Sequence, residues 1–186
     1  MRIGMLSAAH LHVEAYIPLL QALPNVEVIG LADEDHARGA AVAGQFNLRM
    51  FDSYAALLEE RPDAVVVCSE NSRHRALVEL AAEAGAHVLC EKPLATSVDD
   101  ARATVEACER AGVKLMIAFP MRFSAPLVDV KARFDAGALG HVYCFNGVNQ
   151  GQLPAHLRSW FVDPALAGGG ALTDHVVHLA DVFRWY

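Results

Sequence analysis

A carboxylate and an imidazole, Asp174 and His178, stand four residues apart in a stretch with helical periodicity. Residues at this spacing share one face of a helix, with Cβ atoms about 5 to 6 Å apart. A histidine can accept a proton near neutral pH, and a carboxylate beside it can orient the ring or bind a substrate hydroxyl. The pair therefore suits proton transfer on one small molecule. The alternative is an amphipathic helix on which His175, His178 and Asp181 face solvent.

Lys92 offers a positive charge just after an apolar run that ends near Cys90. If this run is a strand of a parallel sheet, Lys92 lies at the carboxyl edge, where α/β folds bind ligands. An ammonium group at that edge could stabilise a substrate oxygen with developing negative charge. A lysine taken alone is more often a solvated surface charge.

The turn that follows the apolar run Arg2 to Leu6 is a possible phosphate site. Dinucleotide-binding folds need a sharp turn here, usually G-x-G-x-x-G, so that backbone N–H groups and a helix N-terminus meet the pyrophosphate. Ser7, Ala9 and His12 stand at the three glycine positions. Serine and alanine are small, but they reach positive φ less readily than glycine, and His12 would alter packing or reach into the site. The expected contacts to such a cofactor are Ser7, Ala8, Ala9, His10, Leu11 and His12.

Asp33 ends the second apolar run, about 20 residues after the turn. In a dinucleotide-binding fold this acid accepts hydrogen bonds from the adenosine ribose and repels a 2′-phosphate, which favours NAD over NADP. Glu34 and Asp35 add negative charge in the same place. The alternative is that Asp33 is the N-cap of a helix over Glu34–Gly44.

Nine histidines raise the question of a metal site. His10-x-His12, or His175 and His178 with Asp174, could be imagined as ligands. We expect no metal, because an imidazole at the turn could instead donate to a phosphate. The four cysteines lie far apart without a C-x-x-C pair, so neither a disulfide framework nor a zinc knuckle is predicted.

The elements that would position these residues alternate between short apolar runs and helical stretches up to about residue 119. This alternation predicts βα units and a doubly wound parallel sheet with helices on both faces, as in Rossmann-type α/β domains. We therefore predict a first domain over residues 1–119. The expected strands are Arg2–Leu6, Val26–Leu31, Leu48–Phe51, Ala64–Cys68, His87–Cys90 and Lys114–Phe119.

A second, α+β domain is predicted over residues 120–186. A helix is expected over Pro126–Phe134, a strand over Gly140–Val148, a loop over Gly151–Gly170 and a helix from Ala171. A sheet with a single strand leaves its edges unpaired. We therefore expect the chain to be truncated or to depend on another chain.

Composition excludes several classes of function. With 22 acidic and 15 basic side chains, the net charge of -7 provides no attraction for a nucleic-acid backbone. The apolar stretches are too short for a signal peptide or a membrane span, so we expect a cytoplasmic protein.

Four segments carry motifs in a distinctive order: Cys68-Ser69-Glu70-Asn71-Ser72-Arg73-His74, Ala84 to Ala95 with Glu91-Lys92-Pro93, Phe119-Pro120-Met121-Arg122-Phe123, and Gly168 to Asp174 with His178 and Asp181. They resemble the Gfo/Idh/MocA oxidoreductase family over essentially the whole chain. Family members usually have well over 300 residues. Glu70 replaces the usual proline before Asn71.

The resemblance implies NAD(P)-dependent chemistry on a hydroxyl or carbonyl carbon of a sugar, an inositol or a related polyol. It places Lys92, Asp174 and His178 at the reacting carbon, and it implies a homo-oligomer formed through the C-terminal sheet. We expect His178 to take the hydroxyl proton, Asp174 to bind a neighbouring hydroxyl or orient the imidazole, and Lys92 to stabilise the oxygen. The further cofactor contacts expected are Ser69, Asn71, His74, Glu91, Lys92 and Arg122.

Two points stay open. Trp160 could stack on a sugar face or on the nicotinamide, or it could simply pack in the core. The altered turn and the short C-terminal part also fit a non-catalytic relative that binds nucleotide weakly and acts as a sensor or assembly partner.

Overall fold

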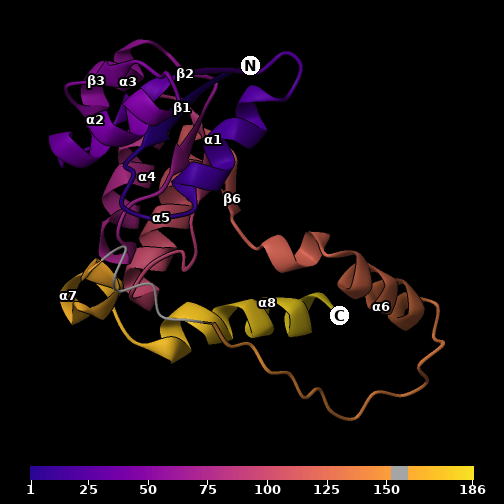
Figure 1. Cartoon of the computed structure of the whole chain (residues 1–186). Helices are drawn as coiled ribbons and strands as arrows, with labels where there is room; N and C mark the ends of the chain where they lie inside the picture. Colours follow the sequence, from indigo (N-terminus) through magenta and orange to yellow (C-terminus); the bar gives the residue numbers. More distant parts are fainter. Residues whose placement is uncertain (152–158) are drawn as a thin grey trace.

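The computed structural model describes residues 1–151 and 159–186, which include a 6-stranded parallel sheet (Figure 1). Its strand order, β3-β2-β1-β4-β5-β6, is that of a doubly wound Rossmann fold. The predicted fold class is therefore confirmed. The strands are β1 (Arg2–Leu6), β2 (Glu27–Ala32), β3 (Met50–Phe51), β4 (Ala64–Val67), β5 (His87–Cys90) and β6 (Leu115–Ile117).

Helices cover both faces of the sheet because each of them has one apolar face. In α3 and α5, Ser53 and Ser97 are the N-caps, and their hydroxyl oxygens accept hydrogen bonds from the amides of Ala56 and Asp100. Gly112 ends α5 in the left-handed conformation that glycine favours. The helices are α1 (Val13–Gln21), α2 (His36–Gln45), α3 (Tyr54–Glu59), α4 (His74–Glu83) and α5 (Val98–Ala111).

Two buried apolar clusters form the core of this unit. One contains Val13 and Ile17 from α1 and Val42 from α2. The other contains Leu57 from α3, Val78 from α4 and Cys108 from α5. The buried polar residues lie mostly just after the strands, at the carboxyl edge of the sheet: Ser7, Asp33, Ser69 and Glu91. That edge therefore carries the groups capable of chemistry.

The chain after β6 contains mostly helical elements. Its short 3-10 helices are η2 (Pro120–Phe123) and η3 (Ser159–Val162), and η4 (Leu172–Val176) is a π-helical turn. A further 3-10 helix, η1 (Asn71–Arg73), lies earlier, between β4 and α4. The α-helices are α6 (Ala125–Asp135), α7 (Pro164–Ala167) and α8 (Val177–Trp185). The helices predicted near residues 126–134 and beyond Ala171 are present. The predicted loop over 151–170 contains η3 and α7, and its residues 152–158 lie outside the described chain.

The strand predicted over Gly140–Val148 is wrong. These residues have no regular secondary structure and form part of the extended segment that follows α6 (Figure 1). Alternating apolar residues form a strand only where a neighbouring strand supplies hydrogen bonds, and the described strands all belong to the one sheet. Tyr143 and Val148 are instead 90% and 80% exposed, while Phe145 stacks on Phe183 of α8.

Within residues 1–151 and 159–186, no helix has the length and apolar character that would let it cross a membrane.

Candidate cofactor and catalytic site

Ser7 begins the turn after β1 with a left-handed backbone at φ +70°. An L-residue in this region lies roughly 1 kcal/mol above glycine. Hydrogen bonds compensate: the Ser7 amide donates to the Ala32 carbonyl at 2.8 Å, and Ser7 Oγ accepts from the Ala9 amide at 3.2 Å. Ser7 thus adopts the left-handed conformation usual for the first glycine of the motif, and these hydrogen bonds stabilise it.

Ala9 and His12, at the other two glycine positions, need no glycine-like backbone. Ala9 is fully buried and packs against Trp160 and Ala167. His12 has φ -65° at the N-cap of α1, an ordinary helical value. Leu11 supports the start of the same helix, because its carbonyl accepts a hydrogen bond from the Glu14 amide at 3.3 Å.

Asp33 connects the end of β2 to this turn. Its Oδ2 accepts the Ala8 amide at 2.6 Å, and its two oxygens accept two N–H groups of Arg38 at 2.9 and 2.6 Å. The N-cap of α2 is Asp35, whose Oδ1 accepts the Arg38 amide at 3.0 Å. Asp33 is therefore not the N-cap. It remains at the position expected of an acid that binds ribose hydroxyls.

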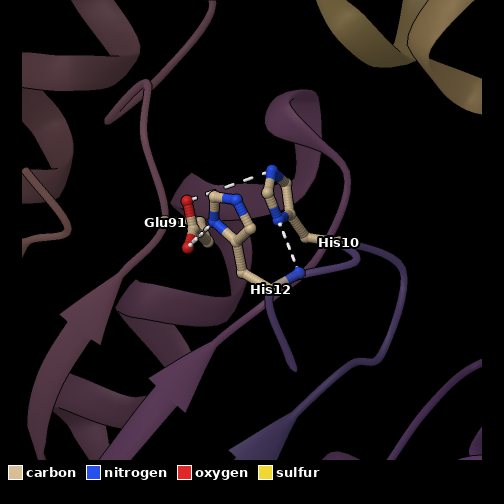
Figure 2. A group of neighbouring side chains, drawn as sticks. All are labelled: His10, His12 and Glu91. Carbon is tan, nitrogen blue, oxygen red and sulfur yellow. Dashed lines mark hydrogen bonds and ion pairs between the residues drawn. The ribbon is translucent and has the colours of Figure 1, made fainter. Parts of the chain in front are cut away.

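Glu91 brings the turn and the end of β5 together (Figure 2). Glu91 Oε1 accepts hydrogen bonds from His12 Nδ1 at 2.9 Å and from the Tyr16 hydroxyl at 2.6 Å, and Oε2 accepts the Lys92 amide at 3.1 Å. His10 Nε2 lies 4.0 Å from Oε2. His10 Nδ1 in turn accepts the His12 amide at 3.2 Å. Two histidines of the turn thus converge on one buried carboxylate.

The environment sets the charge of these groups. Burial would raise the pKa of Glu91, but the hydrogen bond from His12, the nearby His10 and the Tyr16 hydroxyl together lower it to about 2. Burial lowers the pKa of His10 to about 3, against the opposing effect of Glu91. At neutral pH, Glu91 is therefore an anion and His10 a neutral imidazole.

Trp160 packs against the turn. It is 5% exposed, its indole N–H donates to the Ala9 carbonyl at 3.0 Å, and it stacks on Phe161 with ring centroids 4.0 Å apart. Both rings approach His10, with centroids 6.0 and 5.5 Å away. The described contacts are those of a packing residue, and contact with substrate stays a prediction.

Asn71 and His74 join separate loops at the carboxyl edge. Asn71 Nδ2 donates to the Ala167 carbonyl at 2.9 Å. His74 is fully buried; its Nδ1 lies 2.7 Å from the Pro93 carbonyl and its Nε2 3.3 Å from the Ser69 carbonyl. His74 therefore holds the loop that carries Lys92 against the end of β4. Direct cofactor contacts by Ser69, Asn71 and His74 stay predictions.

Lys92 and Asp174 form an ion pair across 82 positions of sequence. The ammonium of Lys92 donates to Asp174 Oδ1 and also lies 3.3 Å from the Asp174 carbonyl oxygen. The Lys92 side chain is 6% exposed and that of Asp174 is 26% exposed. The Lys92–Pro93 peptide bond is cis. The predicted juxtaposition of these two residues is thus present in the structure.

His178 lies beside this ion pair, and the three residues Lys92, Asp174 and His178 are called the corner below. Lys92 and Asp174 both lie within electrostatic reach of its ring, and Phe119 contacts it edge-on at a centroid distance of 6.2 Å. Its Nδ1 is buried and has no hydrogen-bond partner within the described residues. Burial and the charge of Lys92 lower the pKa of His178, against the opposing effect of Asp174. A neutral ring with an unpartnered nitrogen suits a proton acceptor.

Asp174 stays ionised beside it. Burial would raise the pKa of Asp174, but the hydrogen bond and the charge of Lys92 lower it overall. Asp174 lies in the π-helical turn η4 and His178 in α8. Such turns distort the regular helical spacing and recur at functional sites.

A cavity of about 620 Å³ opens next to this corner. Asn71 and Asp174 line it, together with Phe161 and His175. Its volume is in the range of small-molecule sites. Of the predicted substrate residues, Asp174 contributes directly to its wall.

Arg122 forms an ion pair with Asp181. Its guanidinium forms two hydrogen bonds of 2.7 Å with Asp181, which tie η2 to α8. It also approaches the Trp185 ring, with 5.6 Å between Cζ and the centroid. The described role of Arg122 is to hold the junction, and its cofactor contact stays a prediction.

Sequence reasoning did not find three residues of this edge. Arg38 binds Asp33, Tyr16 binds Glu91, and Glu70 lies 3.5 Å from Arg38 with its Oε2 buried and without a hydrogen-bond partner among the described residues. An arginine five residues after the acid is a signal that could have been read. The partner of Tyr16 comes from a distant strand, which local pattern does not reveal.

Residues 1–119 match the family profile described as "Oxidoreductase family, NAD-binding Rossmann fold", and residues 127–186 match that of the GFO/IDH/MocA C-terminal domain. The chain belongs to the Gfo/Idh/MocA oxidoreductase family. This confirms the resemblance inferred from the motifs.

Named relatives include sugar and inositol oxidoreductases. D-xylose 1-dehydrogenase (NADP(+)) 2 of Haloferax volcanii is 39% identical over 174 residues, which cover 92% of this chain and 53% of that protein. 1,5-anhydro-D-fructose reductase of Ensifer adhaerens is 33% identical over 186 residues, which cover 99% and 56%. The crystal structure of GenD2 from gentamicin A biosynthesis in complex with NAD has a TM-score of 0.85 at 26% identity, covering 100% and 53%.

The chain thus spans about half the length of the curated relatives it matches.

Proposed function

We propose that this chain provides the cofactor-binding unit and the reacting groups of an NAD-dependent oxidoreductase that acts on a sugar, an inositol or a related polyol. The observation that carries the proposal is the corner of Lys92, Asp174 and His178, in which an ion pair lies beside an imidazole with an unpartnered buried nitrogen. Three such groups at the carboxyl edge of a Rossmann sheet suit alcohol–carbonyl interconversion.

Each residue has a distinct part in this proposal. His178 takes the proton of the reacting hydroxyl through its free nitrogen, and Lys92 stabilises the oxygen as the proton leaves. Asp174 keeps Lys92 in place and binds a neighbouring hydroxyl. The nicotinamide, when bound, supplies the hydride acceptor. For reduction, His178 returns the proton to the oxygen.

The residues present fit a dinucleotide. The Asp33 side chain is fully buried beside the turn after β1, and the buried carboxylate of Glu70, whose Oε2 lies 3.7 Å from Arg73 Nε, lies on the same edge. Acceptors of this kind suit the hydroxyl and amino groups of an adenosine. Ser7, Ala8 and Ala9 keep the turn small enough for a phosphate to approach.

The proposed cofactor is NAD, because the Asp33 carboxylate stands where a 2′-phosphate would be placed. Arg38 offsets part of this charge through its two hydrogen bonds to Asp33. Replacing Arg38 with alanine should therefore weaken NADP binding more than NAD binding. Isothermal titration with both dinucleotides measures this, and equal losses for the two would count against the assignment.

The substrate class rests on the relatives and on the cavity. Named relatives act on D-xylose, on 1,5-anhydro-D-fructose and on inositol, as their names state. Asp174 and Asn71 give the cavity polar groups that suit several hydroxyls.

The deciding experiment has two parts. The chain is titrated with NAD, and NAD reduction at 340 nm is then followed with a panel of pentoses, hexoses and inositols. We expect saturable binding, together with turnover that His178→Ala abolishes and the control variant His141→Ala preserves. Absence of dinucleotide binding by the folded chain would favour a non-catalytic relative instead.

A further inference from the structure

Three potential metal ligands meet at the turn after β1 (Figure 2). Ligand atoms of His10, His12 and Glu91 all lie within 4.8 Å of one another. The distance from His12 Nδ1 to Glu91 Oε1 is 2.9 Å, and that from His10 Nε2 to Glu91 Oε2 is 4.0 Å. Metal–ligand bonds of about 2.0 to 2.2 Å place tetrahedral ligand atoms roughly 3.3 to 3.5 Å apart. The observed distances lie on either side of that value.

We propose that His10, His12 and Glu91 bind one divalent transition-metal ion, of which Zn²⁺ is the best match. Two imidazoles and one carboxylate form a nitrogen–oxygen set that Zn²⁺ accepts, with a fourth position left for water or a ligand oxygen. Mg²⁺ and Ca²⁺, which prefer oxygen ligands, fit this set less well.

Neighbouring groups hold Glu91 and His10 in position. The Tyr16 hydroxyl and the Lys92 amide both donate to the Glu91 carboxylate and fix its orientation. Phe161 and Trp160 pack beside His10 and limit its rotation. The His12 side chain is 40% exposed, which leaves a route for the ion from solvent.

The cation must displace existing hydrogen bonds. His10 Nδ1 accepts the His12 amide at 3.2 Å. A neutral imidazole has one lone pair, so coordination through Nε2 moves the ring proton to Nδ1 and gives up this long bond. The bond between His12 and Glu91 is likewise exchanged for two metal bonds. The loss of two hydrogen bonds is small compared with three metal–ligand bonds.

This proposal departs from the expectation that the histidines hold no metal. That expectation weighed His10 and His12 as a pair, because Glu91 lies 79 positions away from His12 in the sequence. The fold adds the carboxylate, which turns a two-residue motif into a three-ligand set. Glu91 supplies the negative charge that balances part of the charge of the ion, and it directly precedes Lys92 of the Lys92–Asp174 ion pair.

The test uses the 186-residue chain purified without a histidine tag. After dialysis against a chelator, it is titrated with Zn²⁺ by calorimetry and with Co²⁺ by visible absorption. We expect one ion per chain and the intense d–d bands of a tetrahedral Co²⁺ site. A folded chain that binds neither ion, or binds several at equal affinity, would overturn the proposal.

Variants locate the ion. Glu91→Gln keeps the shape of the side chain but removes its charge, and His12→Ala removes a half-exposed ligand. Each should weaken Zn²⁺ binding by about 100-fold or more. His36→Ala, which changes an exposed histidine on α2, is the matched control and should bind like the unmodified chain. Circular dichroism confirms folding, and unchanged affinity in both ligand variants would refute the site. No dinucleotide is present, so the outcome is independent of the proposed oxidoreductase activity.

Discussion

The turn after β1 and the corner around Lys92 are held in opposite ways. The turn departs from the glycine pattern, yet it is buried, and Asp33 ties it to β2 and α2. The corner keeps the family residues Asp174 and His178, but they belong to a helical segment in which Val182 is the buried residue of α8. The ion pair with Lys92 is the main described polar contact that joins this segment to the sheet.

The two regions show that a motif's geometry can be present without its usual residues. In the turn, Ser7 adopts the conformation of a glycine because surrounding hydrogen bonds impose it. In the corner, the expected residues are present, and their placement depends on a few charged contacts. Substitutions in the turn should therefore change stability according to the packing and hydrogen bonds that they remove. In the corner, the loss of a single charge should strongly lower activity.

Removing the Lys92 ammonium should have the largest effect. In protein shown to turn over a polyol, Lys92→Ala should lower kcat/KM by about 10³-fold, equivalent to about 4 kcal/mol, because a developing oxyanion loses its cation. Steady-state kinetics measure it. Lys131→Ala on α6 is the control and should leave kcat/KM unchanged. Turnover by the Lys92 variant at the unmodified rate would remove Lys92 from the mechanism.

The stability of the two regions can be compared through two ion pairs, Asp33 with Arg38 near the turn and Asp181 with Arg122 on α8. The Asp33 side chain is 0% exposed and that of Arg38 is 21% exposed, whereas Asp181 and Arg122 are 9% and 37% exposed. Asp33→Ala should lower the free energy of unfolding by about 3 kcal/mol, because it leaves a partly buried guanidinium unpaired.

Asp181→Ala should lower it by about 1 to 2 kcal/mol, because its partner can still be hydrated. Urea denaturation of both variants provides the measurement. Equal losses would show that the turn is no more tightly held than the corner.

Sequence pattern predicted the parts of the fold that depend on local apolar runs. The strands Arg2–Leu6 and His87–Cys90 have their predicted bounds. Strands that helices cover on both faces consist of nearly continuous apolar runs, which the sequence shows directly. β3 has only two residues, at the edge of the sheet, where a single neighbour supports it. The strand over Gly140–Val148 failed because pattern cannot supply a pairing partner.

The site was predictable only in part, for related reasons. The approach of Lys92 to Asp174 followed from motifs whose meaning comes from the family. Two aspartates two positions apart, Asp33 and Asp35, both suit an N-cap, and only the path of the backbone decides that Asp35 takes this place. The contact between Glu91 and the turn joins elements distant in sequence and had no local signal.

The fall of kcat/KM at low pH should reflect the protonation of His178. Burial and Lys92 lower the pKa of His178 from its ordinary 6.5, and protonation would remove its capacity to act as a base. The midpoint of the acid limb of kcat/KM should therefore lie below pH 6.5. Measurement of kcat/KM from pH 5 to 8 tests this. A midpoint above 6.5 would assign the limb to another group.

Substitutions of Ser7 should have the smallest effects and probe the turn itself. Ser7→Gly relieves the left-handed backbone but loses the Oγ that accepts the Ala9 amide, so its two effects oppose each other and stability should change by less than about 0.5 kcal/mol. Ser7→Ala keeps the strained backbone and loses the same hydrogen bond. It should therefore be about 1 kcal/mol less stable than the glycine variant. Thermal unfolding of the two proteins gives this difference without reference to catalysis, and an alanine variant as stable as the glycine variant would show that the positive φ at residue 7 imposes no strain.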